Sequence, residues 1–285
     1  MLGKVQRKIQ KLASQIAQLP DEVAYQLALA QHATQLPPLS PCDQQIVVGC
    51  RQEGVYVTSL EALGLPSTAA MLREAKYYLD VMESLRPKQQ LTADTTESIH
   101  PQIFTMTDLP EFAAWGAEQR LLNLAENYIG LPVAFQGVHL RRDFANPFPI
   151  TTELWHQDLE DRRMLKAILY LSDVDEPDGP FEYIPKSAVS PLLAQRIHRR
   201  IAKAHRMGLT DAEMEQLVPR SVWRRCTGPA GTVVFMDPKH IFHHGRSRWR
   251  ERAALFYIYT AAKPLHPEHC TQYRDATFAR PELAR

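Results

Sequence analysis

The 285 residues of the chain, 45% hydrophobic and 23% charged, are enough to bury a sizeable core. The formal net charge of +1 gives no overall field that would attract nucleic acid or an anionic membrane. No apolar run reaches the roughly 18 residues that a membrane-spanning helix needs. The sequence therefore favours a globular protein with neither a membrane nor a nucleic-acid partner.

The first segment, Met1 to Leu19, repeats apolar residues every three or four positions, which predicts an amphipathic helix packed on the body of the protein. It lacks the continuous apolar region of a secretory signal, although its basic residues leave a transit peptide as an alternative. The four cysteines have no paired spacing and are interpreted as free thiols, so a cytoplasmic location is expected by default.

We expect one integrated domain, in which a helical region at residues 1–130 packs on a β-barrel core formed by residues 131–285. The expected elements of the helical region are two short strands and two helices, at residues 45–50, 54–58, 67–85 and 108–128. A capping box formed by Asp108 and Glu111 is expected to begin the last helix.

From Val133 onward, short β-rich runs follow one another, separated by Gly, Pro, Asn and Asp. The predicted strands are Val133–Arg141, Thr151–Asp158, Leu165–Leu171, Phe181–Ile184, Val222–Cys226, Thr232–Met236, Ile241–His244 and Arg252–Thr260. A helical insert at about residues 190–220 interrupts the series, and Asp178-Gly179 is expected to turn the chain between two strands. Eight such strands predict a double-sheet jelly roll, also called a double-stranded β-helix.

The tetrapeptide Trp155-His156-Gln157-Asp158 lies in one of the predicted strands. Because side chains alternate between the faces of a strand, His156 and Asp158 would point the same way and could bind one metal ion. A third ligand could come from His243 or His244, of which only one can face that ion. Two histidines and one carboxylate are the ligand set of non-haem Fe(II) oxygenases. Zinc could also bind, but it offers no redox chemistry.

Such oxygenases use O2 together with a 2-oxo acid, and 2-oxoglutarate carries a second, distal carboxylate. Arg252 opens an apolar strand, so its guanidinium could enter the barrel and bind that carboxylate through two hydrogen bonds. Arg246 is the alternative arginine. Lys166 stands among apolar neighbours and is a further candidate for a carboxylate of 2-oxoglutarate or of the substrate; a side chain that extends to solvent is the alternative.

Taken together, these motifs resemble the phytanoyl-CoA dioxygenase family of Fe(II)- and 2-oxoglutarate-dependent oxygenases. The resemblance covers residues 155–259 and includes Trp-His-Gln-Asp-Leu, Gly-Thr-Val-Val-Phe-Met-Asp, His-His-Gly and the following arginine. It implies that His156, Asp158 and His243 bind the iron, and that Arg252 binds 2-oxoglutarate. Members of the family often have a slightly longer spacing before that arginine.

The resulting hypothesis is a dioxygenase that hydroxylates an unactivated C–H bond of a small molecule and releases succinate and CO2. A non-catalytic, cupin-like metal-binding or sensing protein is the main alternative, and a zinc hydrolase is a third reading. The basic residues of the helical insert would suit an anionic substrate, and a solvated helix face is the other interpretation of them. The sequence specifies neither the substrate nor the oligomeric state.

Overall fold

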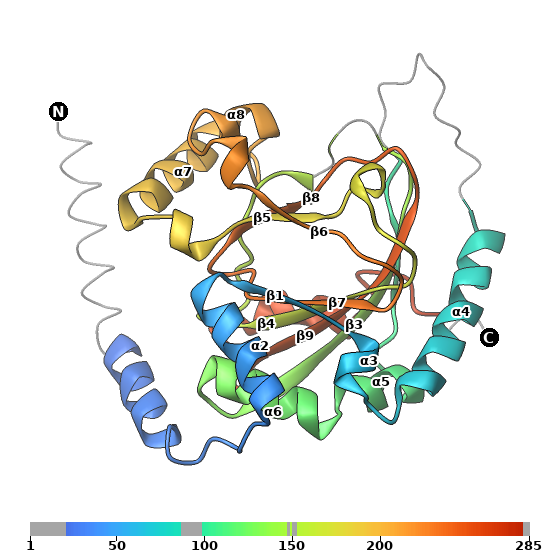
Figure 1. The fold of residues 1–285 in the computed structure, drawn as a ribbon, viewed down its shortest axis with the longest axis horizontal. Coiled ribbons are helices and arrows are strands. Elements are labelled where there is room, and N and C mark those ends of the chain that lie inside the picture. Colours follow the sequence, from blue (N-terminus) through green and yellow to red (C-terminus); the bar gives the residue numbers. More distant parts are fainter. Residues whose placement is uncertain (1–20, 87–98, 147–148, 150–152, 282–285) are drawn as a thin grey trace.

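The core of the fold consists of two antiparallel β-sheets (Figure 1). The computed structural model describes residues 21–86, 99–146, 149 and 153–281, so the predicted helix at residues 1–19 lies outside the described residues. The larger sheet has the strand order β1-β7-β4-β9-β3-β2 and the smaller sheet the order β6-β5-β8. Their bounds are β1 Val55–Ser59, β2 Gln102–Thr105, β3 Val133–Asp143, β4 Leu165–Tyr170, β5 Phe181–Ile184, β6 Arg224–Cys226, β7 Thr232–Met236, β8 Phe242–Gly245 and β9 Arg252–Ala261.

Alternation along the strands gives the larger sheet two different faces. On β4, Ile168 and Tyr170 pack with residues of the smaller sheet, such as Phe181 and Cys226, in the interior between the sheets. The intervening residues of β4 face the opposite side and join a second apolar cluster together with the helices. The larger sheet thus separates a barrel interior from an outer, helix-covered face.

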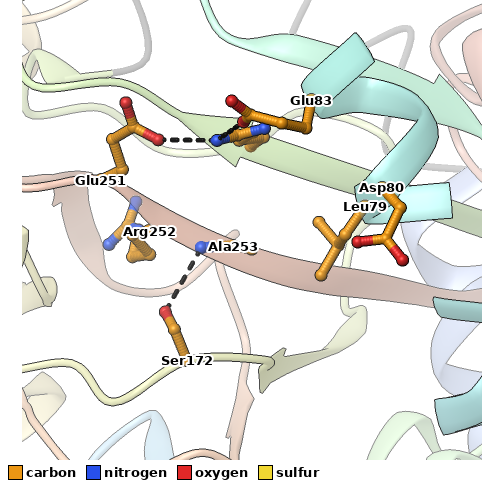
Figure 2. Close-up of a pocket in the computed structure, with 8 residues that line it drawn as sticks. Leu79, Asp80, Glu83, Ser172, Glu251, Arg252 and Ala253 are labelled. Atoms are coloured by element: carbon orange, nitrogen blue, oxygen red, sulfur yellow. Dashed lines mark hydrogen bonds and ion pairs between the residues drawn. The ribbon is translucent and has the colours of Figure 1, made fainter. Parts of the chain in front are cut away.

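The helices on the outer face come from the first half of the chain, and the insert helices lie beside the smaller sheet (Figure 1). Their bounds are α2 Pro41–Gln52, α3 Leu60–Leu63, α4 Thr68–Ser84, α5 Pro110–Gly116, α6 Gln119–Ile129, α7 Pro191–Ala204, α8 Asp211–Glu215 and α9 Pro267–Cys270. Beside the start of β9, Leu79, Asp80 and Glu83 of α4 line a pocket of about 320 Å³ (Figure 2). No helix among the described residues is long and apolar enough to cross a bilayer.

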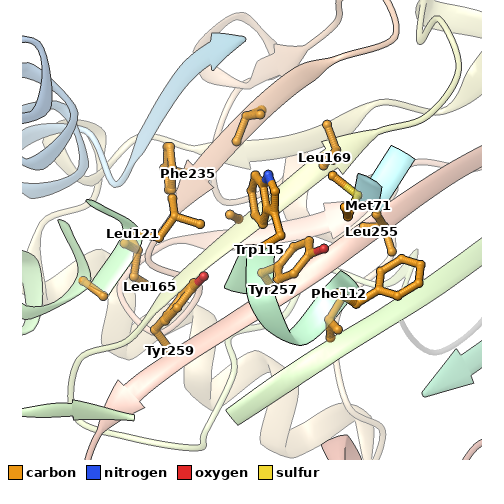
Figure 3. Close-up of a cluster of buried hydrophobic side chains, with 14 of the residues drawn as sticks. Met71, Phe112, Trp115, Leu121, Leu165, Leu169, Phe235, Leu255, Tyr257 and Tyr259 are labelled. Carbon is orange, nitrogen blue, oxygen red and sulfur yellow. The ribbon is translucent and has the colours of Figure 1, made fainter. Parts of the chain in front are cut away.

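The outer cluster is built around aromatic side chains of α5 and β9 (Figure 3). Trp115 is fully buried, its ring centroid lies 4.3 Å from that of Tyr257, and its indole N–H donates to Thr68 Oγ1 at 3.1 Å. This cluster fixes the helices of the first half of the chain to the back of the larger sheet.

Most predicted strands from Val133 onward are confirmed, but one is wrong in its described part. Within residues 153–158, Trp155 and His156 form only isolated bridges, to Leu209 and His243. Strand β2 was not predicted. The helical insert is confirmed, and α8 begins with a capping box formed by Thr210 and Glu213.

Two expectations for the first half of the chain are wrong. Residues 45–50 belong to α2, because Pro41 at its first turn and the side chain of Ser40, which accepts from Asp43 N, begin a helix there. The single helix expected at residues 108–128 is two helices, α5 and α6. Asp108 caps neither of them, because its carboxylate pairs with Arg280.

We predict that Trp115→Ala lowers the free energy of unfolding by about 3–5 kcal/mol, because it leaves a cavity in the outer cluster and removes an aromatic contact. Trp249→Ala is the matched control, since this side chain is 76% exposed, and it should change stability by less than about 0.5 kcal/mol. Urea unfolding followed by circular dichroism measures both. Equal losses for the two variants would contradict the assignment of Trp115 to the core.

Candidate metal centre

Side chains from two distant segments meet at the edge of the smaller sheet. His156, Asp158 and His243 each offer one ligand atom, and these atoms all lie within 4.8 Å of one another. The backbones of His156 and His243 exchange two hydrogen bonds of 3.0 Å, and Asp158 N donates to Pro238 O at 3.0 Å. Asp158 Oδ1 lies 3.4 Å from Nε2 of His156 and 3.7 Å from Nε2 of His243. This grouping is able to hold a divalent cation.

The orientation of both imidazoles suits metal binding. Nδ1 of His156 lies 2.6 Å from Leu154 O, and Nδ1 of His243 lies 3.4 Å from Ile241 O. A carbonyl can only accept, so each Nδ1 carries the proton and each Nε2 keeps its lone pair for a metal ion. Burial lowers the pKa of His243 to about 3, whereas Asp158 raises the pKa of His156 although burial opposes it, so a metal ion would replace a proton at His156. The donor set therefore fits iron(II).

His244 lies on the opposite face of β8. Its Nε2 is 2.9 Å from Glu182 Oε2, its Nδ1 is 2.9 Å from Glu153 O, and its ring stacks on Trp155 with centroids 4.1 Å apart. Of the two histidines that the sequence left open, His243 lies with the other two candidate ligands.

Lys166 points from β4 into the barrel interior, toward a candidate ligand. Its Nζ lies 2.6 Å from Asp158 Oδ2, 3.0 Å from Glu160 Oε1 and 3.2 Å from the hydroxyl of Tyr273. Although burial opposes it, the charges of Asp158 and Glu160 hold the pKa of Lys166 well above its usual range. Lys166 is thus a charged partner of Asp158, and the reading in which it extends to solvent is wrong.

Arg252 also enters the barrel, where it meets a buried carboxylate. Its Nε and Nη2 donate to Asp143 Oδ2 at 3.2 and 2.9 Å, and its Nη1 donates to Gly179 O. Arg141 Nε contacts Asp143 Oδ1 at 2.7 Å, and Arg248 Nη1 lies 3.5 Å from the same atom. Although burial opposes it, these three arginines hold the pKa of Asp143 well below its usual range.

Arg246, the alternative arginine, and Arg142, the chain neighbour of Arg141, both lie outside the barrel. Arg246 pairs with Glu176, a partly exposed carboxylate. Arg142 lines the pocket beside α4, where it contacts Glu83 and lies 2.9 Å from Glu251 Oε2. Arg141 and Arg142 therefore serve opposite faces of β3.

Sequence reasoning missed several members of these clusters, among them Asp143, Glu160 and Tyr273. Asp143 follows Arg141 by two positions, so alternation along β3 could have placed both on one face. Glu160 stands two residues after Asp158, so the same two-residue spacing could have suggested that these carboxylates lie on one face. Tyr273 comes from the segment that follows α9, and no pattern in the sequence connects it with β4.

One curated protein with significant similarity to the chain is a hydroxylase. The L-proline trans-4-hydroxylase of Streptomyces griseoviridis is 26% identical over 182 residues, which cover 55% of this chain and 67% of the relative. No protein-family model matches the chain.

Solved structures with the same fold bind 2-oxoglutarate. HygX from Streptomyces hygroscopicus, solved with nickel and 2-oxoglutarate, superimposes with a TM-score of 0.51 at 16% identity over 79% of this chain and 88% of HygX. EctD from S. alaskensis, solved with 2-oxoglutarate and 5-hydroxyectoine, gives a TM-score of 0.51 at 21% identity over 81% of each chain. The chain has the fold of the 2-oxoglutarate-dependent oxygenases. The predicted jelly roll and the resemblance noted in the sequence are confirmed.

We predict that Lys166→Met lowers the free energy of unfolding by about 3–5 kcal/mol, because Asp158 and Glu160 lose the cation between them. Adding Glu160→Gln to this variant should recover part of the loss, since it removes one of the two carboxylate charges. The control is Lys76→Met, which breaks an exposed pair with Asp80 and should cost less than about 1 kcal/mol. Urea unfolding at neutral pH measures all four proteins, and no recovery in the double variant would count against the network.

His139 on β3 is buried against Tyr273 and lies 3.1 Å from Gln272 O. Burial lowers its pKa from 6.5 to about 4. The unfolded chain therefore takes up a proton that the folded chain excludes as pH falls from about 6.5 to 4, and stability falls in that window. Between pH 7 and pH 5, His139→Gln should therefore lose about 2 kcal/mol less stability than wild type loses.

Urea unfolding of wild type and His139→Gln at the two pH values measures this difference. The exposed His269→Gln serves as control and should follow the wild-type pH dependence. If His139→Gln also followed it, the neutral, buried state of His139 would be disproved.

Proposed function

We propose that the chain is an Fe(II)- and 2-oxoglutarate-dependent dioxygenase that hydroxylates an unactivated C–H bond of a small molecule and releases succinate and CO2. The observation that carries the proposal is the grouping of two imidazole Nε2 atoms and one carboxylate oxygen within 4.8 Å. The hydroxylase relative and the solved neighbours with Fe, nickel and 2-oxoglutarate support this class over a non-catalytic metal-binding protein.

In this proposal, His156, Asp158 and His243 hold the iron through the two Nε2 atoms and Asp158 Oδ1. Bound there, ferrous iron would supply the redox chemistry that O2 activation requires, together with open positions for the 2-oxo acid and O2. Lys166 occupies the second oxygen of Asp158, so that this carboxylate presents a single oxygen to the metal. The protein would thereby supply three ligand atoms to the metal, one from each of the three side chains.

The distal carboxylate of 2-oxoglutarate would bind at the arginine cluster that includes Arg252. Guanidinium groups match the planar geometry of a carboxylate and keep their charge at any physiological pH. The barrel interior between this cluster and the candidate ligands is lined by apolar side chains such as Ile168 and Phe181, which suit the methylene groups of the co-substrate.

We further propose that the substrate is a small molecule with an anionic group. EctD and HygX were solved with 5-hydroxyectoine and hygromycin B, both of which are small molecules. Helix α7 carries several basic residues. Its His198 lies 2.7 Å from Oε1 of Gln157, the residue that stands between the candidate ligands His156 and Asp158. A cytoplasmic location is supported by the four cysteines, all of which are free.

The test of the proposed function is formation of succinate from 2-oxoglutarate by the anaerobically purified protein after addition of Fe(II) and O2. We expect His156→Ala and His243→Ala to lose metal binding and turnover, because each removes a ligand. His244→Gln should keep both, since this side chain faces away from the metal site. Tight zinc binding without consumption of 2-oxoglutarate would instead indicate the hydrolase reading.

A further inference from the structure

The motif Gly-Thr-Val-Val-Phe-Met-Asp ends on a carboxylate to which the proposed function gives no task. The motif forms β7 and ends on Asp237, which follows the strand directly and is fully buried. Burying a charged carboxylate is costly unless hydrogen bonds and opposite charges compensate for it. The partners of Asp237 therefore indicate what this residue holds in place.

Asp237 orders the turn that follows β7, formed by residues 237–240 and called the Asp237 turn below. Its Oδ1 accepts a hydrogen bond from Lys239 N at 3.0 Å, and its backbone carbonyl accepts one from His240 N at 3.1 Å. Nδ1 of His240 lies 2.7 Å from Oδ2 of Asp237. Three contacts within four residues thus fix the shape of the turn.

Further partners connect Asp237 to the body of the protein. The hydroxyl of Tyr128 on α6 donates to Asp237 Oδ2, and Lys186 Nζ lies 3.7 Å from the same oxygen and 2.9 Å from the hydroxyl. The backbone N–H of Asp237 donates to Gly54 O at 2.9 Å. Although burial opposes it, the hydrogen bond from His240 and the charge of Lys186 hold the pKa of Asp237 below its usual range. A charged, fully bonded carboxylate therefore anchors the turn.

The Asp237 turn in turn holds the segment of one candidate metal ligand. Asp158 does not lie in a regular strand, and its backbone makes one hydrogen bond to the described residues, from its N–H to Pro238 O at 3.0 Å. The neighbouring Gln157 donates its amide N–H to Lys239 O at 2.8 Å. Both acceptors are carbonyl groups of the Asp237 turn, so the turn places this segment.

The two candidate histidine ligands have other supports. His243 lies within β8, which pairs with β5, and it exchanges two backbone hydrogen bonds with His156. In the described part of the chain, the backbone of Asp158 has no support of this kind beyond the Asp237 turn. A displacement of the turn would therefore move Asp158 before it moved either histidine.

We propose that Asp237 is a positioning residue of the metal centre, which holds Asp158 in place as a ligand through the turn that it orders. This inference rests on the proposed function, because it requires Asp158 to bind the metal. It makes the affinity for a divalent cation depend on a carboxylate that does not touch the cation. Groups that orient metal ligands typically contribute a factor of about 10–100 to metal affinity.

The test measures Ni²⁺ binding to the full chain by isothermal titration calorimetry. Asp237→Asn keeps the shape of the side chain but leaves one acceptor oxygen for donors that now share two. The turn should loosen, and Ni²⁺ binding should weaken by roughly 10- to 100-fold.

The matched control is Asp43→Asn, which also removes the charge of a buried carboxylate. Asp43 of α2 pairs with Arg120 of α6 at 2.8 Å, on the helix-covered side of the larger sheet. This variant should lose stability but keep the wild-type affinity for Ni²⁺. An equal loss of affinity in both variants would show that the effect of Asp237→Asn is general destabilisation.

A second comparison asks whether Asp237 acts through Asp158. Asp158→Ala should still bind Ni²⁺ more weakly through the two imidazoles. Adding Asp237→Asn to this variant should change its affinity by less than about twofold, because the ligand that the turn positions is already gone. The full loss of affinity in this background would overturn the proposal.

Tyr128→Phe takes the place of Asp237→Asn if circular dichroism shows that the latter does not fold. It removes one donor to Asp237 and leaves the carboxylate. Ni²⁺ binding should weaken roughly two- to tenfold, the change that corresponds to one hydrogen bond. Unchanged affinity in this variant would overturn the proposal.

The outcomes separate this inference from the proposed function. If wild type does not bind Ni²⁺, or binds it no better than His156→Ala does, the proposed function fails and this inference fails with it. If wild type binds Ni²⁺ through His156 and the two Asp→Asn variants have equal affinities, only the positioning role of Asp237 is overturned.

Discussion

The two backbone hydrogen bonds between His156 and His243 are the interaction on which the candidate metal centre depends. They join a segment that precedes β4 to strand β8, although the two segments lie far apart in the chain. Once this pairing is made, alternation along β8 decides the rest: His243 faces His156 and Asp158, and His244 faces Trp155 and Glu182. His244 stacks on Trp155 on the other side of the same pairing.

The barrel interior has charged groups at two depths and apolar side chains between them. Lys166 neutralises part of the charge of Asp158 and Glu160 beside the candidate ligands, and arginines surround Asp143 further along. Between them, the interior is lined by residues such as Ile168 and Phe181. A dicarboxylate with an aliphatic middle also has a charged group, an apolar part and a second charged group in that order. Under the proposed function, a bound dicarboxylate would offset part of the cost of burying these charged side chains.

The sequence predicted the strands well where short apolar, β-rich runs are bounded by turn residues, as in β4 and β9, and it predicted the residues that gather at the candidate metal centre. It failed at residues 45–50, where apolar residues suggested a strand but the helix signals of Ser40 and Pro41 determine the structure. The partners of Arg252 and Lys166 were not foreseen, because they depend on strand register and on a segment near the C-terminus. Local sequence patterns indicate on which face of a strand a residue lies, but they do not indicate which charged side chain lies opposite it.

Gln157 connects the candidate metal centre with the insert that interrupts the barrel. It stands between His156 and Asp158 in the chain, and its amide contacts His198 of α7 at 2.7 Å and Lys239 O at 2.8 Å. The barrel strands are constrained by packing on both faces, whereas α7 has an exposed face and a single buried residue, Ile197. Side chains on α7 can therefore change at little cost in stability while staying anchored beside the candidate ligands. An exposed helix can vary in sequence without rebuilding the barrel, so similarity of fold does not fix the substrate.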